Sequence, residues 1–452
     1  FSSFINNIDT AVLIPESMRL REKEGDEKAN SFLNYFLMIY FVIGMLFTVG
    51  MYFFGTTIFG LISKFSQADI IIYRNYFWAG SFFFIFHVLT NYFNSILTSL
   101  KYFSLPMVIS SVKSCIVIVC IFLLRAEYDV MSVIAGGLIS YAVNLLIQMY
   151  ILYKIAGWKF SFKKPPIRKS TWSNVFYSEL GQITTVASSM FPLYLLSGFG
   201  SGVISVMNYG KNIADIPNTL VTSQFANVIG IKLNEEFARK DYAGMNETFL
   251  SISKMMVFIL VPLGCFMFVF AEPIVELFYN RGNFTQQAVV DSAKFMQLLS
   301  ITIFSIGVNA IVTRIFVAIQ AIRQAFFYQV VLNIILIAAI WICTRYYGAY
   351  GYAYAIIIMN LINFISMYFI CRELVPHIKY EALLKYSGFI ILINAGIATG
   401  LFFAVHYIQV ANLVKVITGF WLYFIILLML NKKFALNTEL AYILKHVKKK
   451  FY

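Results

Sequence analysis

The chain has 452 residues, of which 60% are apolar and only 12% are charged. Its mean hydropathy is +0.77, whereas an average soluble domain carries about 25% charged residues. This composition argues against a soluble enzyme, a disordered chain and a nucleic-acid-binding domain. It predicts an integral membrane protein with many spans. The net charge of +14 comes from 35 Lys and Arg against 21 Asp and Glu, an excess that is typical of cytoplasmic loops.

Twelve segments are apolar over the roughly 20 residues that a helix needs to cross a bilayer core of about 30 Å. Their runs are continuously apolar and do not alternate, which argues against a membrane barrel. The sequence therefore predicts an all-α polytopic membrane protein. The expected spans lie near residues 32–54, 76–100, 105–125, 130–153, 173–198, 203–230, 254–271, 293–313, 325–344, 349–371, 386–407 and 411–431.

The distribution of basic residues predicts an orientation. If residues 1–31 are cytoplasmic, the segments on that side hold 26 Lys and Arg, whereas the opposite side holds 5. Such a bias favours a cytoplasmic amino end and a cytoplasmic basic tail at 432–452. The link at 154–172 carries six of these cations together with Pro165 and Pro166, which end any helix there. It separates four spans from eight, as a joint between two helical bundles would.

The cysteines and histidines form no recognisable site pattern. The five cysteines lie in apolar runs without a CxxC pair, and the four histidines are dispersed, so we expect neither a disulfide framework nor a metal site. The sequence shows no nucleotide-binding loop and no arrangement of catalytic residues. We therefore expect a protein that is not an enzyme, needs no cofactor and binds no nucleic acid.

Ionisable residues inside predicted spans are costly there and mark candidate sites. Lys211 and Asp215 are four residues apart on one helix face, beside Pro217. A helix broken next to a charge suits a cavity wall, although a neutralised pair that locks two helices is the alternative. Lys113 and Glu179 also lie within predicted spans. Their alternative is a place nearer the membrane interface, which a long side chain can reach.

Several stretches carry a family resemblance. EPIVELFYNRGNFT at 272–285 is similar to a signature of the MviN/MurJ-type lipid II flippases, through Glu272, Pro273, Arg281, Gly282 and Phe284. Three further stretches resemble the same family in the same order. They are GVISVMNYGKNIADIP at 202–217, IVTRIFVAIQAIRQAFF at 311–327, which contains Arg314, and AVLIPESMRLREKEG at 11–25.

The resemblance implies a member of the multidrug/oligosaccharidyl-lipid/polysaccharide exporter superfamily. Its fold would be two helical lobes around a central cavity, plus two extra C-terminal helices. The family has fourteen spans, so the twelve here would lack the first two. The implied organisation begins with a cytoplasmic N-terminal segment (1–31), a first-lobe remnant of four spans (32–153) and a cytoplasmic inter-lobe link (154–172). A second lobe of six spans (173–371), the extra helix pair (372–431) and the basic cytoplasmic tail (432–452) follow.

The family carries cavity arginines in its first two helices and another at the end of the eighth. Glu235 stands at the last of these positions, and Lys232, one turn away, is the candidate substitute. The family's cargo is lipid II, and this departure leaves open related saccharides on undecaprenyl diphosphate, such as O-antigen or exopolysaccharide units. An ion-coupled multidrug antiporter of the same superfamily and a non-transporting membrane scaffold are the rival readings.

The sequence thus favours a flippase of the bacterial inner membrane that moves a polyprenyl-diphosphate-linked saccharide by alternating access. Lys211, Lys113 and Lys232 are the candidate contacts for its phosphates. Asp215 and Glu179 are the candidates for coupling to H⁺ or Na⁺. The expected partners are the lipid-linked oligosaccharide and membrane lipids, and the protein is expected to be a monomer.

Overall fold

The computed structural model describes residues 8–9, 13–100, 102, 104–159, 169–200, 202–319, 321–407 and 411–437. Within these ranges the chain is helical, and none of the described residues forms a strand. Contacts between Cα atoms divide the chain into two compact units, Phe1–Tyr194 and Leu195–Tyr452. The middle of the inter-lobe link (160–168) and most of the basic tail (438–452) lie outside the described residues.

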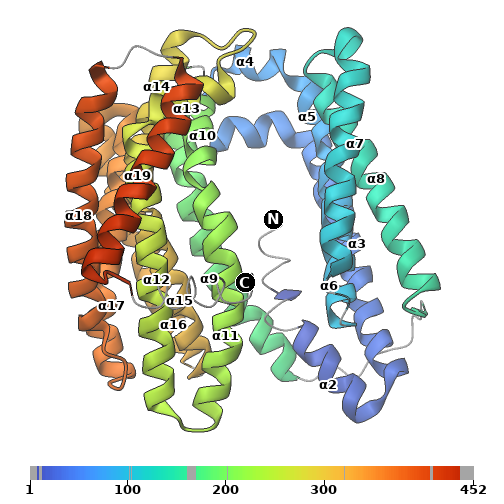
Figure 1. Ribbon diagram of the computed structural model, residues 1–452. Coiled ribbons are helices and arrows are strands. Elements are labelled where there is room, and N and C mark those ends of the chain that lie inside the picture. Colours follow the sequence, from blue (N-terminus) through green and yellow to red (C-terminus); the bar gives the residue numbers. More distant parts are fainter. Residues whose placement is uncertain are drawn as a thin grey trace, which may run out of the picture. The chain divides into compact units, whose positions relative to one another are not determined.

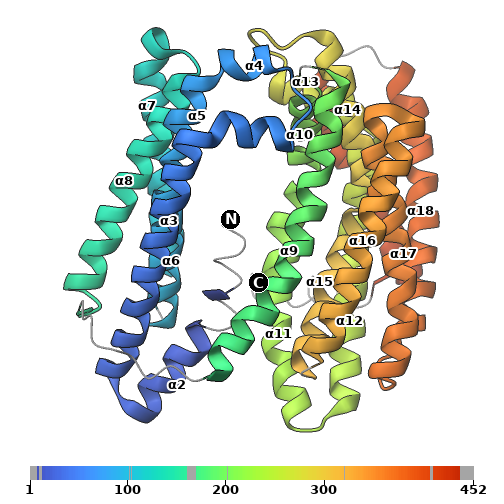
Figure 2. The same ribbon diagram turned by 180° about the vertical axis from the view of Figure 1, so that it is seen from behind.

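The first unit is built around α3, the longest helix of this unit, with 37 residues. Helix α3 packs against α2, α5 and α6, while α8 packs against α6 and α7 (Figure 1). The chain turns after α3 and continues through the short helices α4 and α5 (Figure 2). The helices of this unit are α2 (Ile14–Glu24), α3 (Asp26–Ile62), α4 (Gln67–Ile72), α5 (Arg74–Ser81), α6 (Phe83–Ser99), α7 (Ser104–Tyr128), α8 (Met131–Lys154) and α9 (Lys169–Leu196), whose last two residues belong to the second unit.

Buried apolar side chains of α3 and α6 form the core of the first unit. Phe32, Phe36 and Tyr40 recur at the spacing that places residues on one helix face, and they are almost fully buried. They meet Tyr92 and Ile96 of α6 in the same core cluster. One face of α3 is therefore fixed by protein, while its exposed face carries large apolar residues such as Leu46 and Phe53, as a lipid-facing helix would.

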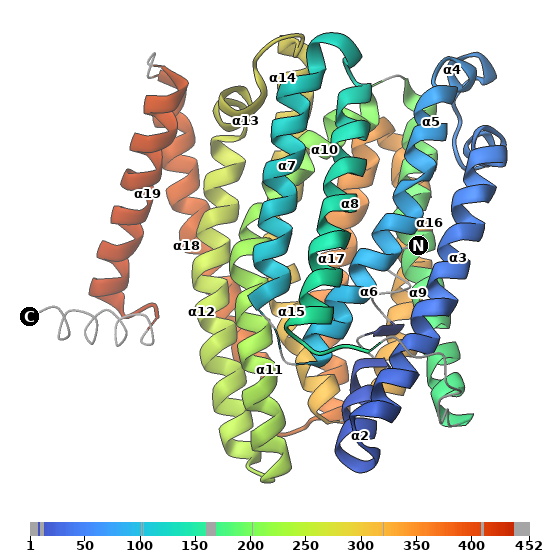
Figure 3. The same cartoon turned by 90° about the vertical axis from the view of Figure 1, so that its right-hand side faces the viewer.

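The second unit is arranged around α12, which packs against α11, α14, α15 and α18. Helix α19 packs against α13 and α18 (Figure 3). The helices of this unit are α10 (Val203–Ala214), the π-helical turn η3 (Asn218–Thr222), α11 (Ser223–Ala238), α12 (Tyr242–Val269), α13 (Ala271–Tyr279), α14 (Gln286–Ser300), α15 (Ile303–Ala318), α16 (Ile322–Tyr347), α17 (Gly351–Leu374), α18 (Tyr380–Tyr407) and α19 (Asn412–Phe434).

Seven helices of the described residues are long and apolar enough to cross a membrane, or eight if one bent pair is counted as a span. One of the seven is a run of 51 residues, Gln324–Leu374, which contains both α16 and α17. The chain is thus an all-α polytopic membrane protein, and the number of twelve spans stays a prediction.

Several predicted spans are interrupted helices. The span expected at 76–100 changes from α5 to α6 at Phe82, and the span at 293–313 bends by 44° between α14 and α15. The span at 203–230 breaks beside Asp215 and Pro217, where α10 ends and η3 follows. Proline has no N–H to donate and disturbs the preceding turn, so the sequence did predict this last break.

One glycine sets the distance between α10 and α14. A Cβ atom at Gly210 would collide with the carbonyl oxygen of Ser292 and would lie 2.9 Å from the Cβ of Phe295. Only a residue without a side chain allows this approach of two backbones. The helix that carries Lys211 is therefore held tightly against α14.

Candidate functional site

Lys211 and Asp215 form an ion pair at the carboxyl end of α10. The Lys211 Nζ lies 2.6 Å from the Asp215 Oδ2, and the two side chains are 40% and 43% exposed. Neither group is buried in a dry core, so both can exchange partners. A charge-assisted hydrogen bond of this length orients the lysine along the helix. The residues predicted from their spacing to share a face are thus in direct contact.

The backbone around the pair is irregular. Asp215 caps α10, and its carbonyl accepts a hydrogen bond from the Thr219 N–H at 3.0 Å. Pro217 follows, and the chain then forms the π-helical turn η3, in which the Thr222 hydroxyl donates to the Asn218 Oδ1 at 2.9 Å. Such turns inside helices are rare and often mark functional positions. The ion pair therefore lies at a break where polar side chains and irregular backbone coincide.

Lys113 belongs to a polar cluster in the first unit. Its Nζ lies 4.3 Å from the centre of the Tyr141 ring, a cation–π distance. The Tyr141 hydroxyl lies 2.8 Å from the His87 Nδ1, and the Asn91 side chain contacts the His87 Nε2 at 3.0 Å. This cluster joins α6, α7 and α8. Lys113 therefore points at protein, and its charge is held beside an aromatic face.

Lys232 and Glu179 have different surroundings. The Lys232 Nζ lies 3.8 Å from the Glu236 Oε1, and Lys232 is 60% exposed. The same Glu236 oxygen accepts a hydrogen bond from the Thr248 hydroxyl of α12 at 2.7 Å. Glu179 of α9 is half-buried, and its charge acts on Tyr40 of α3. Lys113 and Glu179 thus belong to the first unit, while Lys211, Asp215 and Lys232 belong to the second.

The signature at 272–285 covers α13 from its second residue onward and the turn that leads to Thr285, the N-cap residue of α14. Gly282 adopts a positive φ of 64°, a conformation that favours glycine. The Arg281 guanidinium donates to the carbonyl of Phe278 at 2.8 Å and stays exposed. Glu272 and Pro273 occupy the first turn of α13, where an acidic side chain and a proline are both favourable. These residues of the signature therefore have a structural role, in the first turn of α13 and in the turn that follows this helix.

Three aromatic rings hold the same turn against α10. The rings of Tyr209 and Tyr279 are 4.7 Å apart, and Phe284 lies 5.2 Å from Tyr209. Tyr209 is two residues before Lys211, so two of the stretches that resemble the flippases pack on each other. Arg314 of a third stretch lies against α11, since a Cβ at Gly230 would be 3.2 Å from its Cδ.

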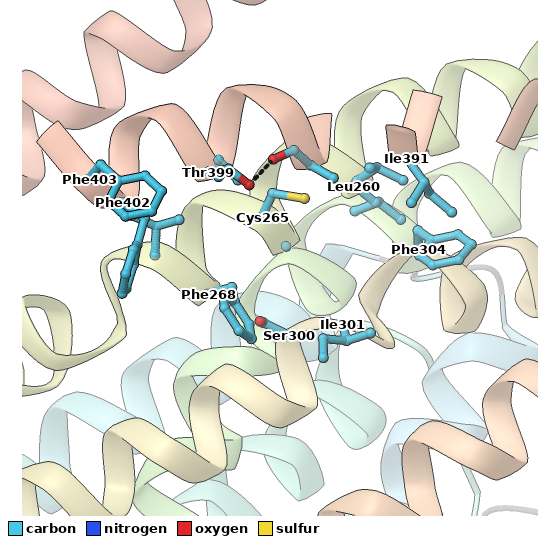
Figure 4. Close-up of a pocket in the computed structure, with 15 residues that line it drawn as sticks. Leu260, Cys265, Phe268, Ser300, Ile301, Phe304, Ile391, Thr399, Phe402 and Phe403 are labelled. Carbon is cyan, nitrogen blue, oxygen red and sulfur yellow. Dashed lines mark hydrogen bonds between the residues drawn. The ribbon is translucent and has the colours of Figure 1, made fainter. Parts of the chain in front are cut away.

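An apolar pocket of about 430 Å³ opens between α12, α18 and the bend from α14 to α15 (Figure 4). Leu260, Phe268, Phe304 and Phe402 are among its lining residues. The few polar groups are satisfied locally: the Thr399 hydroxyl donates to the Ala395 carbonyl at 2.8 Å, and the Ser300 hydroxyl donates to the Gln297 carbonyl at 2.7 Å. The pocket therefore offers an apolar guest no unpaired polar partner.

Sequence reasoning missed two features. Tyr141 lies within an apolar run and has no local signal that would predict its contact with Lys113. Asp9, placed in a cytoplasmic segment by the sequence, is fully buried and hydrogen-bonded to α3 and α6. An acidic residue in the apolar stretch IDTAVLI was the signal for it. Among the described residues, no group of His, Cys, Asp and Glu could hold a metal ion.

Comparisons with known sequences point to one family. A family model described as "Lipid II flippase MurJ" matches residues 4–423. A protein of Borreliella burgdorferi named "Probable lipid II flippase MurJ" is 22% identical over 366 residues, which are 80% of this chain and 72% of that protein. A Bdellovibrio bacteriovorus protein of the same name is 21% identical over 218 residues, 47% of this chain and 41% of its own length. The chain thus spans about two fifths of the Bdellovibrio relative.

Two solved structures of membrane transporters have a similar fold. One described as "Lipid II flippase MurJ, inward closed conformation" has a TM-score of 0.77 and 19% identity, and the match covers 96% of this chain and 92% of that one. An inward-facing multidrug resistance MATE family transporter has a TM-score of 0.70 and 16% identity, with coverage of 85% and 88%. At these identities the structures establish the fold alone.

Proposed function

The chain belongs to the lipid II flippase MurJ family, and we propose that it moves a polyprenyl-diphosphate-linked saccharide across the bacterial inner membrane. The cargo is lipid II or a related precursor of a cell-surface polysaccharide. The family match over residues 4–423 is the observation that carries this proposal. Members of the family are membrane transporters of cell-wall synthesis and not enzymes, so the proposed mechanism is alternating access without chemistry on the cargo.

The proposed layout is a four-span first lobe, a link at 154–172, a six-span second lobe and an extra helix pair. In this proposal the amino end at 1–31, the link and the tail at 432–452 are cytoplasmic. The excess of basic residues in these segments supports it. The protein acts as a monomer in this scheme.

Lys211 is the proposed contact for the diphosphate, with Lys113 and Lys232 as further cations. A diphosphate in a site of low dielectric needs positive partners, because an unpaired buried anion is strongly disfavoured. In the structure the Lys211 Nζ is held by Asp215 at 2.6 Å. Phosphate binding must therefore compete with this carboxylate, and the 40% exposure of Lys211 leaves room for the exchange.

Asp215 is the proposed coupling residue, with Glu179 as the second candidate. When a proton or Na⁺ neutralises Asp215, the Lys211 ammonium loses its partner and becomes free for phosphate. Binding of the cation and binding of the anionic cargo then favour each other, which is the reciprocity that coupled transport requires. The driving ion is H⁺ or Na⁺ in this scheme.

The apolar pocket is the proposed binding site for part of the lipid chain of the cargo. Its lining by Leu260, Phe268, Phe304 and Phe402 suits an isoprenoid or acyl chain, because burial of apolar surface is favourable and no polar group is stranded. The charged head and the apolar tail of one cargo would then contact different surfaces. A cationic drug would use neither Lys211 nor Lys113, so these residues favour a flippase over a multidrug antiporter.

Reconstitution of the full-length protein in liposomes tests the proposal. Translocation is measured for lipid II, for a polyprenyl-diphosphate oligosaccharide and for a cationic dye, under an imposed H⁺ or Na⁺ gradient. We expect movement of at least one lipid-linked saccharide and none of the dye. Movement of the dye alone would assign the antiporter function, and movement of nothing by folded protein would favour a scaffold.

A further inference from the structure

One face of α6 packs against one face of α8 along two matched rows of residues. The rows are Phe83, His87, Thr90 and Asn94 of α6, and Gly137, Tyr141, Asn144 and Gln148 of α8. Within each row the residues are spaced as neighbours on one helix face. The two rows have the same spacing and run in the same direction, so each residue of one row lies level with one residue of the other.

Contacts confirm this register at three of the four levels. At the first level, a Cβ atom at Gly137 would lie 2.6 Å from the Cζ of the phenylalanine opposite. At the second, the Tyr141 hydroxyl lies 2.8 Å from the His87 Nδ1. At the fourth, the Gln148 Nε2 donates to the Asn94 Oδ1 at 2.8 Å. The third pair lies between these levels and is therefore held face to face.

This third pair, Thr90 and Asn144, is polar and buried. The two residues are 3% and 4% exposed, and the Thr90 Oγ1 and the Asn144 Oδ1 have no hydrogen-bond partner among the described residues. Gln148 brings a third such atom to the same level. Its Nε2 also donates to the Thr90 carbonyl at 3.3 Å, whereas its Oε1 is buried and lacks a partner in the same part of the chain. Three orphaned oxygens thus meet inside a predicted membrane span, where such groups are costly.

The chemistry of these three atoms fits one water molecule. The Thr90 hydroxyl can donate to the water, and the water can donate its two protons to the Asn144 Oδ1 and the Gln148 Oε1. Three hydrogen bonds are the usual number for a buried water. A cation fits less well, because all three ligand atoms are neutral. In addition, the Lys113 ammonium already lies 4.3 Å from the centre of the Tyr141 ring, one turn before Asn144.

We propose that Thr90, Asn144 and Gln148 bind one structural water between α6 and α8, and that this water fixes the register of the two helices. One bound water gives all three orphaned atoms a hydrogen bond. Tyr141 lies on the same face of α8 as Asn144, so the register also determines where its ring meets the Lys113 ammonium. The site lies entirely within the first unit.

Thermal unfolding of the protein in lipid nanodiscs tests the site through two substitutions. Thr90→Val and Asn144→Leu keep the approximate shape of each side chain and remove its polar atoms. If the two residues share a water, each variant unfolds about 2–4 °C below the wild type, which is the shift for one buried hydrogen bond in a unit of this size. The double variant loses less than the sum of the two shifts, because the first substitution already releases the water.

Thr48→Val in α3 is the matched control. Thr48 is 5% exposed, and its hydroxyl also lacks a partner among the described residues. It follows an apolar contact, since Gly44, one turn earlier, packs against Ile85 and Val88. A methyl group that replaces a single unpaired hydroxyl leaves the unfolding temperature unchanged or raises it. The same result for Thr90→Val or Asn144→Leu, or fully additive losses in the double variant, would overturn the proposal.

A measurement on the wild type keeps the test decisive if the variants do not fold. A cryo-electron microscopy map that resolves ordered water should show one peak within hydrogen-bond distance of the Thr90, Asn144 and Gln148 side-chain oxygens. A map that resolves other buried waters but no peak here would contradict the proposal. A rise in unfolding temperature with Na⁺ that Thr90→Val abolishes would assign the site to a cation and would also overturn it. These measurements need no transport, so their results are independent of the proposed flippase function.

Discussion

The ion pair of Lys211 and Asp215 couples two charges that transport would need to separate. Both side chains are about two fifths exposed, and the distance between Nζ and Oδ2 is 2.6 Å. An exposed pair of this kind contributes little to stability, about 0.3–0.5 kcal/mol on a helix. Its removal should therefore leave the fold intact, so that a loss of activity reports on the cargo.

We predict that Lys211→Ala lowers translocation of the lipid-linked saccharide by about tenfold or more. The variant cannot form the proposed charge-assisted hydrogen bond to the diphosphate, and such a bond contributes about 1.5–3 kcal/mol. Lys211→Arg should keep much of the activity, since it keeps the positive charge. Translocation is measured at matched expression in cells. Lys385→Ala is the matched control, because Lys385 and Glu381 form the same four-residue pair at 2.6 Å. Wild-type translocation by Lys211→Ala would remove this residue from the mechanism.

The close contact between α10 and α14 depends on Gly210, which directly precedes Lys211. We predict that Gly210→Val destabilises the protein by about 1–3 kcal/mol, because the new side chain meets the Ser292 carbonyl and the Phe295 Cβ. Thermal unfolding in detergent measures the loss. Gly400→Ala in α18 has no atom within 4 Å of the new Cβ and should be neutral or slightly stabilising. Equal unfolding temperatures for both variants would contradict the close packing.

The positions of the helices, and some of their breaks, could be predicted from the sequence. The apolar runs predict where helices lie, and Pro217 predicts the break after α10, because both signals are local. The change from α5 to α6 at Phe82 directly follows Gly80 and Ser81, a pair of residue types that is common at helix kinks. The bend at Ile301 and Thr302 carries no proline or glycine, so it depends on packing with other helices, which a local pattern cannot show.

The candidate site shows the same limit. Lys211 and Asp215 are four residues apart, so helix geometry alone predicts their contact. Asp9 meets Tyr40 and Ser95, which are 31 and 86 residues away in the chain, and Lys113 meets Tyr141 of another helix. Such pairs are set by tertiary packing. The family resemblance was recoverable because the turn at Gly282 and the ring of Phe284 impose residue types on a short stretch.

At the scale of the whole molecule, the orientation in the membrane is testable with two exposed turns. The bias of 26 to 5 basic residues places the turn between α11 and α12 inside the cell and the turn between α13 and α14 outside. We predict that a cysteine introduced by Asn283→Cys reacts with an impermeant thiol reagent added to intact cells.

The paired variant Lys240→Cys should react only after the cells are opened. Both residues are exposed in the structure, so access to the reagent and not burial decides the result. The five native cysteines are replaced by alanine in the background, which removes reaction at Cys115. Labelling of Lys240→Cys from outside, with Asn283→Cys protected, would invert the topology.

The central claim is that this chain carries a lipid-linked saccharide across the inner membrane, and it is tested most directly in cells depleted of their own lipid II flippase. The measurement is the fraction of lipid II that an externally added lipid II-cleaving enzyme can reach. Expression of the full-length protein should restore that fraction to the level of undepleted cells, since the family match points to this cargo class. If lipid II stays on the cytoplasmic face while the protein is present in the membrane at a matched level, lipid II is not its cargo.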